Sequence, residues 1–193
     1  MNFSVVKISS LIDSVGESEV VSALSEFKCE KNPEIENFIK NNAVEFARRK
    51  ISVTHLILDD EGQISAYFTL THKPAIIPAD ALSKSAVKTL SRYAILDKDS
   101  NSFNISAFLI AQFGKNSAYK GTKNISGNEL MDLCFAVLES VQKQVGGGIA
   151  FLECENKKPL LDFYQNENNR FRVYGERFSK SENTNYIQLL RFF

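Results

Sequence analysis

The sequence predicts a mixed α/β fold, with a central, mostly antiparallel sheet flanked by helices on both faces. Strand-like and helical patterns alternate along the whole chain. Residues 51–58 and 63–71 are strand-like runs joined by a short polar connection that contains Gly62, as in a β-hairpin. Residues 103–154 follow the order strand, polar loop, helix, strand. These three observations give the fold class.

Length and composition fit one globular domain over 1–193, in which 73–102 is an insertion or a long connection. The chain has 193 residues, 44% of them hydrophobic, with 23 basic and 23 acidic side chains. The N-terminus lacks the pattern of a secretory signal, and no apolar run approaches the length of a membrane span. We therefore expect a cytoplasmic protein that does not contact membranes. The neutral balance argues against a protein that binds nucleic acid chiefly through charge.

The cysteines and histidines give no sign of a metal site. The three cysteines are widely spaced, and Cys-x-x-Cys and His-x-x-x-His patterns are absent from the sequence. We expect three reduced thiols, two of them in the core, and no bound metal. His55 and His72 are each expected on the surface of a strand.

In the first half of the chain, a short strand is expected over 2–8 and an amphipathic helix over 17–27. Pro33 suits the first turn of a second helix, whose apolar side chains share one face through Ala47. After the hairpin, 81–93 has a helical pattern and 97–102 is expected to be a loop.

The second half begins with a strongly apolar strand over 103–113 and a polar loop over 114–125. Ser126 and Glu129 have the spacing of a capping box, and an apolar stripe continues to Val145. The three glycines after Val145 end this helix. The remaining elements are a strand over 149–154, a short helix after Pro159, and a terminal strand pair over 171–178 and 186–193.

The loop before Ser126 is a candidate anion site. The first N–H groups of a helix lack partners and lie at the positive end of its dipole. The loop adds Lys115, Lys120 and Lys123, with no acidic residue between Gly114 and Ser126. A diphosphate fits this pattern; equally, Gly127 can serve only a tight helix entry, with solvated lysines. Nucleotide-hydrolysis and dinucleotide motifs are absent from the sequence.

The order of elements and several stretches resemble the GNAT superfamily, the Gcn5-related N-acetyltransferases. The resemblance is strongest over 103–171 and weaker over 2–71. It is carried by the following stretches: Ile110-Ala111-Gln112-Phe113, Ile125-Ser126-Gly127-Asn128-Glu129-Leu130-Met131, Phe151-Leu152-Glu153-Cys154-Glu155, Leu160-Leu161-Asp162-Phe163-Tyr164, and Phe171. In the family's pyrophosphate loop, Gly127 matches the second glycine, whereas Ile125 replaces the first and Thr122 the Gln or Arg.

This resemblance implies that acetyl-CoA is the cosubstrate, and it assigns two sets of residues. The residues matched to cofactor binding are Ile110, Ala111, Gln112, Thr122, Lys123, Asn124, Ile125, Ser126, Gly127, Asn128 and Asn156. Tyr164 matches the family's tyrosine that protonates the departing thiolate, although its alternative role is to pack a short helix.

A general base is not marked by the resemblance. Glu153, Glu155, His72 and Asp97 are candidates by rough placement. Glu155 ranks first because it lies just beyond a strand end that faces the presumed cleft. Each of these side chains is also compatible with a plain surface role.

The leading hypothesis is an N-acetyltransferase that moves an acetyl group from acetyl-CoA to a primary amine of a small molecule or peptide, by direct attack in a ternary complex. One alternative is a GNAT-fold module that binds CoA, or nothing, without turnover. Residues 27–29 and 64–70 are also similar to small GNAT toxins that acetylate aminoacyl-tRNA. Charged tRNA is therefore the one nucleic acid that the sequence leaves open as a partner. Residues 73–102 are candidates to shape the acceptor pocket, and a homodimer is left open.

Overall fold

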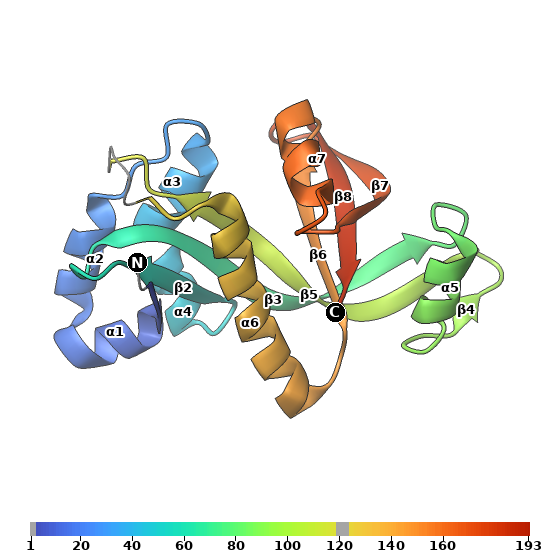
Figure 1. Cartoon of the computed structure of the whole chain (residues 1–193), viewed down its shortest axis with the longest axis horizontal. Helices are drawn as coiled ribbons and strands as arrows, with labels where there is room; N and C mark the ends of the chain where they lie inside the picture. Colours follow the sequence, from blue (N-terminus) through green and yellow to red (C-terminus); the bar gives the residue numbers. More distant parts are fainter. Residues whose placement is uncertain (1–2, 119–123) are drawn as a thin grey trace. The chain divides into compact units, whose positions relative to one another are not determined.

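The computed structural model describes residues 3–118 and 124–193 (Figure 1). The strands are β1 (Ser4–Lys7), β2 (Val53–Leu58), β3 (Ile64–Pro78), β4 (Leu96–Asp97), β5 (Ser102–Lys115), β6 (Ile149–Glu155), β7 (Arg172–Ser179) and β8 (Thr184–Phe192). The helices are α1 (Ile8–Val15), α2 (Glu17–Ser25), α3 (Pro33–Asn41), α4 (Ala43–Arg48), α5 (Lys84–Leu90), α6 (Gly127–Val145) and α7 (Lys158–Gln165).

The strands form one mixed sheet in the order β1-β2-β3-β5-β6-β8-β7, with β4 paired to β5. β5 and β6 pair in parallel, whereas the β1–β2, β2–β3, β6–β8 and β7–β8 pairs are antiparallel. The mixed, mostly antiparallel sheet confirms the predicted fold class.

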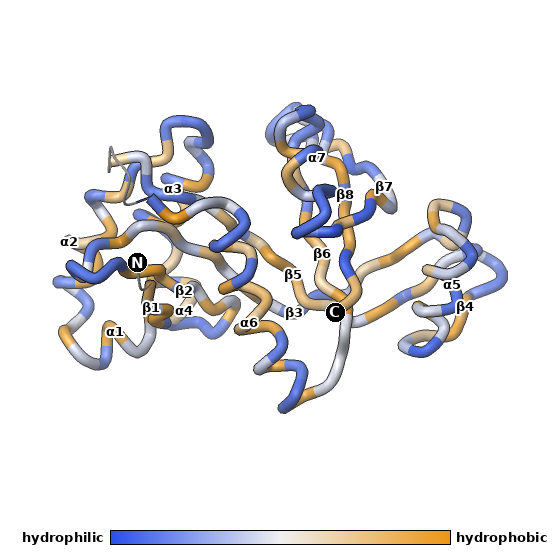
Figure 2. The backbone as a smooth tube through the Cα atoms, in the orientation of Figure 1, coloured by the Kyte–Doolittle hydropathy of each residue, from blue (hydrophilic) through white to orange (hydrophobic). Residues whose placement is uncertain are grey.

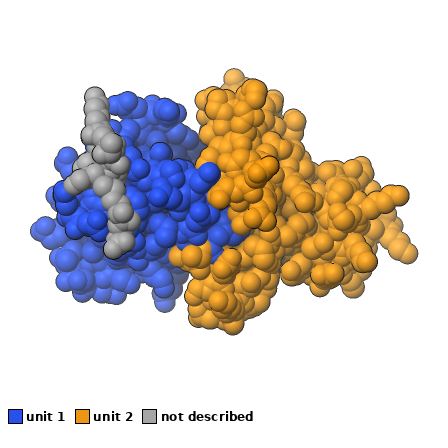
Figure 3. Space-filling view, in the orientation of Figure 1, with its two compact units in different colours: residues 1–71, 110–135 blue, residues 72–109, 136–193 orange. Residues whose placement is uncertain are grey.

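The chain divides into two compact units, coloured separately in Figure 3. Unit 1 comprises residues 1–71 and 110–135, and unit 2 comprises 72–109 and 136–193. β3, β5 and α6 each contribute residues to both units. Each unit has its own apolar core.

The core of unit 1 lies between helices α1–α4 and strands β2 and β3. Its largest buried side chain is Tyr67, whose hydroxyl donates to the carbonyl of Ile35 at 2.6 Å and whose ring meets Phe27 edge-on at 5.3 Å. A buried hydroxyl needs such a partner, and this one joins the sheet to α3. Burial also raises the pKa of Tyr67.

The core of unit 2 joins the extended half of β3 to β5, β6, β8 and α5. Ile77, Leu90 and Phe103 are fully buried in it. The backbone N–H of Ala79 donates to the carbonyl of Asn101 at 2.9 Å, which closes the segment between β3 and β5. Residues 79–101 are therefore an integral part of unit 2.

One helix was not predicted, and two predicted elements differ in extent from those observed. Residues 8–15 form α1, a helix that the sequence pattern did not indicate. The helix predicted over 33–47 is two helices separated at Asn42, whose backbone lies at φ −120°. β3 continues seven residues beyond the predicted Thr71, and its pairing with β2 ends at Leu70. Pro74 is tolerated there because a strand edge without a partner needs no N–H donor.

The thiols follow the prediction, but His55 does not. All three cysteines are free, with Cys134 and Cys154 buried and Cys29 half-buried. The prediction that His55 lies on a strand surface is wrong: its side chain is 4% exposed and stacks on Phe68 at 4.9 Å. Burial, followed by the nearby charge of Lys7, lowers the pKa of His55 to about 4.

Within 3–118 and 124–193, no helix has the length and apolar character needed to cross a bilayer.

Candidate functional site

The capping box predicted at the start of α6 is present. The N–H of Ser126 donates to Oε2 of Glu129 at 2.8 Å, and the N–H of Glu129 donates to Oγ of Ser126 at 3.1 Å. Hydrogen bonds with Ser126 lower the pKa of Glu129, and Lys115 contributes a weaker effect in the same direction. The helix therefore begins at a fixed point, with Gly127 as its first residue.

Ile125, which replaces the first glycine of the family loop, is 1% exposed. Burial of its branched side chain favours a fixed backbone just before the helix. Asn124 and Asn128 on either side are exposed. Thr122 and Lys123, also matched to cofactor binding, lie outside the described residues.

The other predicted cofactor residues of unit 1 lie near the end of β5. Ile110 is buried, and Ala111 and Gln112 are half-buried. The Oε1 atom of Gln112 is buried without a hydrogen-bond partner among the described residues. A buried, unsatisfied carbonyl oxygen is uncommon in folded proteins and costs free energy, so this side chain is a candidate to bind a ligand.

Asn116 follows β5 and joins three segments of unit 1. Its Nδ2 donates to the carbonyl of Ile64 at 2.8 Å, and its Oδ1 accepts from the N–H of Lys28 at 3.0 Å. The N–H of Ser117 donates to the carbonyl of Lys28 at 2.8 Å. These bonds hold the segment after α2 beside the loop that leads toward α6.

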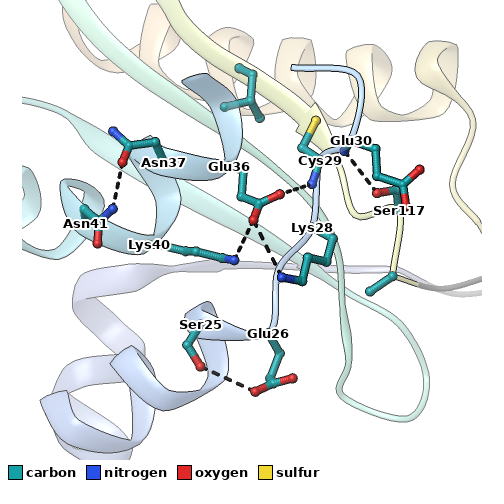
Figure 4. A network of polar contacts seen from close by, with 12 residues as sticks. Ser25, Glu26, Lys28, Cys29, Glu30, Glu36, Asn37, Lys40, Asn41 and Ser117 are labelled. Atoms are coloured by element: carbon teal, nitrogen blue, oxygen red, sulfur yellow. Dashed lines mark hydrogen bonds and ion pairs between the residues drawn. The ribbon is translucent and has the colours of Figure 1, made fainter. Parts of the chain in front are cut away.

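Figure 4 shows a carboxylate, that of Glu36, at the centre of the polar network in this segment. It accepts from Nζ of Lys40 at 2.7 Å and from the N–H of Cys29 at 2.8 Å, and Nζ of Lys28 lies 3.8 Å away. The Lys40 hydrogen bond is the main reason that the pKa of Glu36 is lowered. A surface cavity of about 340 Å³ adjoins the network. Because Glu36 is engaged by these donors, it is a poor proton acceptor for chemistry in that cavity.

In unit 2, Tyr164 lies in α7 and is 8% exposed. Its ring meets those of Phe163 and Phe171 edge-on, at 5.0 and 5.8 Å. The N–H of Phe171 donates to the carbonyl of Tyr164 at 2.9 Å, and Nδ2 of Asn169 donates to that of Phe163 at 2.7 Å. The asparagine-rich turn therefore fixes the end of α7 and the position of the tyrosine.

Glu155 and Asn156 come directly after the buried part of β6. Glu155 is half-buried, pairs with Tyr186 of β8 and forms an ion pair with Lys157, whereas Asn156 is exposed. A single exposed lysine leaves a carboxylate accessible, so Glu155 remains a candidate base.

The other three candidate bases have different environments. Glu153 accepts hydrogen bonds from Nε and Nη2 of Arg177 and from Nε2 of Gln188. Burial raises the pKa of Glu153, but these hydrogen bonds outweigh burial and lower it overall. The pKa of Asp97 is lowered chiefly by the hydroxyl of Ser100. Both carboxylates are weakened as bases. His72 is exposed, and its Nδ1 lies 3.1 Å from Oγ of Ser106.

Similarity to solved structures decides the fold. AtaT complexed with acetyl-methionyl-tRNAfMet has a TM-score of 0.62 and 18% identity, covering 99% of this chain and 95% of that chain. A tyrosine-to-phenylalanine mutant of KacT has a TM-score of 0.64 and 15% identity, covering 96% and 94%. AtaTR bound with AcCoA has a TM-score of 0.59 and 16% identity, covering 99% and 93%. This chain has the GNAT fold. No protein-family model and no curated protein matches the sequence, so the likeness is one of structure.

Within the GNAT fold, β5 and the start of α6 are the elements that the sequence matched to acetyl-CoA binding, and α7 holds the matched tyrosine. The first group lies in unit 1, and Glu155, Asn156 and Tyr164 lie in unit 2. Sequence reasoning missed Asn116 as the residue that joins the segments of unit 1. Its partners are distant in the chain, 52 residues away for Ile64 and 88 for Lys28, so no local pattern marks it.

Proposed function

We propose that this protein is an acetyl-CoA-dependent N-acetyltransferase. The observation that carries the proposal is the capped start of α6, which follows β5 in a chain with the GNAT fold. A helix N-terminus that follows a loop with basic side chains favours bound phosphate. AtaTR, similar in fold, was solved with AcCoA.

The residues of unit 1 fit the phosphates of acetyl-CoA. The carboxylate of Glu129 is turned back onto the N–H of Ser126, and the adjoining N–H of Gly127 begins the helix. Lys115 is exposed and close enough to lower the pKa of Glu129. The side chain of Ile125 is buried away from solvent, which is compatible with backbone contact at the replaced glycine. The buried Oε1 of Gln112 accepts hydrogen bonds, so it suits an N–H or O–H donor of the cosubstrate and not its phosphates.

The chemistry is assigned to residues of unit 2. The acceptor nitrogen attacks the thioester carbonyl, a C–N bond forms, and the C–S bond breaks with its electron pair on sulfur. The hydroxyl of Tyr164 gives a proton to that thiolate. Glu155 takes the proton that the amine loses, directly or through water.

The acceptor we propose is the amine of an aminoacyl-tRNA. AtaT was solved with acetyl-methionyl-tRNAfMet, which carries an acetylated amino acid. We therefore favour aminoacyl-tRNA over a small-molecule or peptide amine as the acceptor. Zero net charge describes the chain as a whole and does not prevent a local basic surface from binding RNA.

Thermal unfolding in the presence of acetyl-CoA tests the proposed cosubstrate. Acetyl-CoA at about 100 times its dissociation constant should stabilise the fold by roughly 2.7 kcal/mol. Adenosine at equal concentration is the control, because it lacks the pyrophosphate. If millimolar acetyl-CoA leaves the unfolding temperature unchanged, the cosubstrate assignment is wrong. Stabilisation without turnover on amines, peptides and charged tRNA would favour the non-catalytic CoA-binding module instead.

A further inference from the structure

The segment between β3 and β5 has an exposed basic face. Lys84 and Lys88 are one helical turn apart on α5, and Arg92 follows in the turn that continues from it. All three are exposed. On the opposite side of α5, Ala86 is buried and Leu90 is part of the core of unit 2. At 3.6 residues per turn, Lys84 and Lys88 lie opposite these buried residues.

The cations on this face are not engaged in ion pairs among the described residues. No acidic residue occurs between Asp80 and Asp97 in the sequence. Within the part of the chain that the structure describes, Lys84, Lys88 and Arg92 form no ion pair. By contrast, Lys40, Lys158 and Arg177 are each bound to a carboxylate. Unpaired cations attract a polyanion more strongly than cations that are already paired with a carboxylate.

Neighbouring groups on the same segment suit a sugar–phosphate chain. Ser83 and Ser85 add hydroxyls beside Lys84, and Tyr93 follows Arg92 with 43% of its surface exposed. The Tyr93 hydroxyl lies beside Gly148, which brings this turn close to the start of β6 within unit 2. Figure 2 shows hydrophilic stretches around α5 and β4. Basic side chains interleaved with an aromatic ring are typical of nucleic-acid-binding surfaces.

We propose that this face, formed by Lys84, Lys88, Arg92 and Tyr93, binds the phosphate backbone of an RNA acceptor. The assignment of RNA as acceptor rests on the proposed function, whereas the basic face itself does not. A membrane surface fits less well, because membrane-bound helices present apolar residues beside their cations. Here Ala86 and Leu90 of α5 are buried, and the exposed aliphatic residues Ile76 and Ile95 lie outside the helix.

The test is a charge reversal, Lys84→Glu with Lys88→Glu and Arg92→Glu, measured by anisotropy with fluorescent uncharged tRNA. We expect the affinity to fall by about tenfold or more, and the slope of log affinity against log salt to decrease by about 2. A matched control variant, Lys143→Glu with Lys158→Glu and Lys180→Glu, makes the same charge change elsewhere in unit 2. Its affinity for tRNA should fall less than that of the α5 variant. The milder triple to glutamine, checked for folding by circular dichroism, should give an intermediate loss.

The outcomes separate this proposal from the proposed function. If the two glutamate triples lose tRNA affinity equally, or neither loses any, the surface assignment is wrong. Loss of binding to phosphatidylserine vesicles or to a poly-glutamate peptide, with tRNA binding intact, also overturns it. Calorimetric titration with acetyl-CoA should give the same affinity for wild type and the α5 triple. Failure of wild type to bind acetyl-CoA would instead reject the proposed function.

Discussion

Ser126 and Glu129 are joined by two reciprocal hydrogen bonds at the first turn of α6, of 2.8 and 3.1 Å. Each side chain accepts the backbone N–H of the other residue, so two of the helix's unpaired donors are satisfied locally. The positive end of the helix dipole lies at Gly127, the first residue of α6. The proposed phosphate site depends on this position.

Loss of the cap should weaken the protein. Ser126→Ala removes the oxygen that accepts from Glu129, and we expect the free energy of unfolding in urea to fall by about 1 kcal/mol. Ser140→Ala, an exposed substitution within the same helix, should leave stability unchanged or slightly higher because alanine favours helices. Equal losses for the two variants would show that the capping bonds do not stabilise α6.

An acidic residue at the start of α6 should separate helix stability from cosubstrate binding. Gly127→Asp places a carboxylate where the helix dipole favours it, so stability should not fall. The same charge repels phosphate, and we expect acetyl-CoA affinity to fall by about tenfold or more. Calorimetry on Ala136→Asp, which adds the charge to an exposed position further along α6, should give nearly wild-type affinity. Unchanged binding by Gly127→Asp would remove this helix start from the site.

Removal of one hydroxyl should separate catalysis from packing at Tyr164. Tyr164→Phe keeps the ring contacts with Phe163 and Phe171 but removes the proposed acid. We expect kcat to fall about a hundredfold or more with acetyl-CoA affinity unchanged. Tyr174→Phe, which also removes a buried hydroxyl in unit 2, should keep its turnover. Wild-type turnover by Tyr164→Phe on a good acceptor would exclude it as the acid.

The buried histidine predicts a pH dependence of stability. The pKa of His55 is lowered to about 4 in the folded state by burial and by Lys7, from an ordinary value of 6.5. The unfolded chain therefore binds this proton first, and stability falls as pH falls from about 6.5 to 4, by at most about 3 kcal/mol. Unfolding measured across this range should depend less on pH in His55→Gln than in wild type. His72→Gln, at an exposed position, should follow the wild-type curve. A His55→Gln curve parallel to wild type would contradict the assignment.

The close approach of β5 to α3 predicts a cost for any side chain at Gly114. A Cβ atom there would overlap Cγ2 of Ile35. Gly114→Ala should reduce the free energy of unfolding by about 1–3 kcal/mol through overpacking. Because Ile35→Ala removes the opposing methyl group, the double variant should lose less than the sum of the two single losses. Strict additivity would show that the two positions do not meet.

Local signals in the sequence were enough for the elements whose stability is local. The Ser-x-x-Glu spacing at Ser126 and the glycines after Val145 marked both ends of α6, because capping involves neighbouring residues. The hairpin and the terminal strand pair followed from alternation and polar turns. The break at Asn42 and the continuation of β3 past Thr71 were missed, because they depend on packing and pairing between distant segments.

The same distinction holds for the candidate site. Gly127 and Tyr164 were found by resemblance to a family pattern, and their roles remain predictions. The burial of Ile125 and His55 could not be foreseen, because either side of a strand or loop can face the core. Asn116 has no local signature, since its role comes from bonds to Ile64 and to Lys28, both far away in the chain.

Acetyl transfer to charged tRNA tests the central claim most directly. The purified protein is incubated with acetyl-CoA and aminoacyl-tRNA, and the esterified amino acid is analysed by mass spectrometry. The account predicts one added acetyl group on the amine, release of one CoA for each, and loss of product in Tyr164→Phe. The account is contradicted if the protein binds acetyl-CoA but leaves the esterified amino acid unmodified. In that case amines and peptides also remain unmodified.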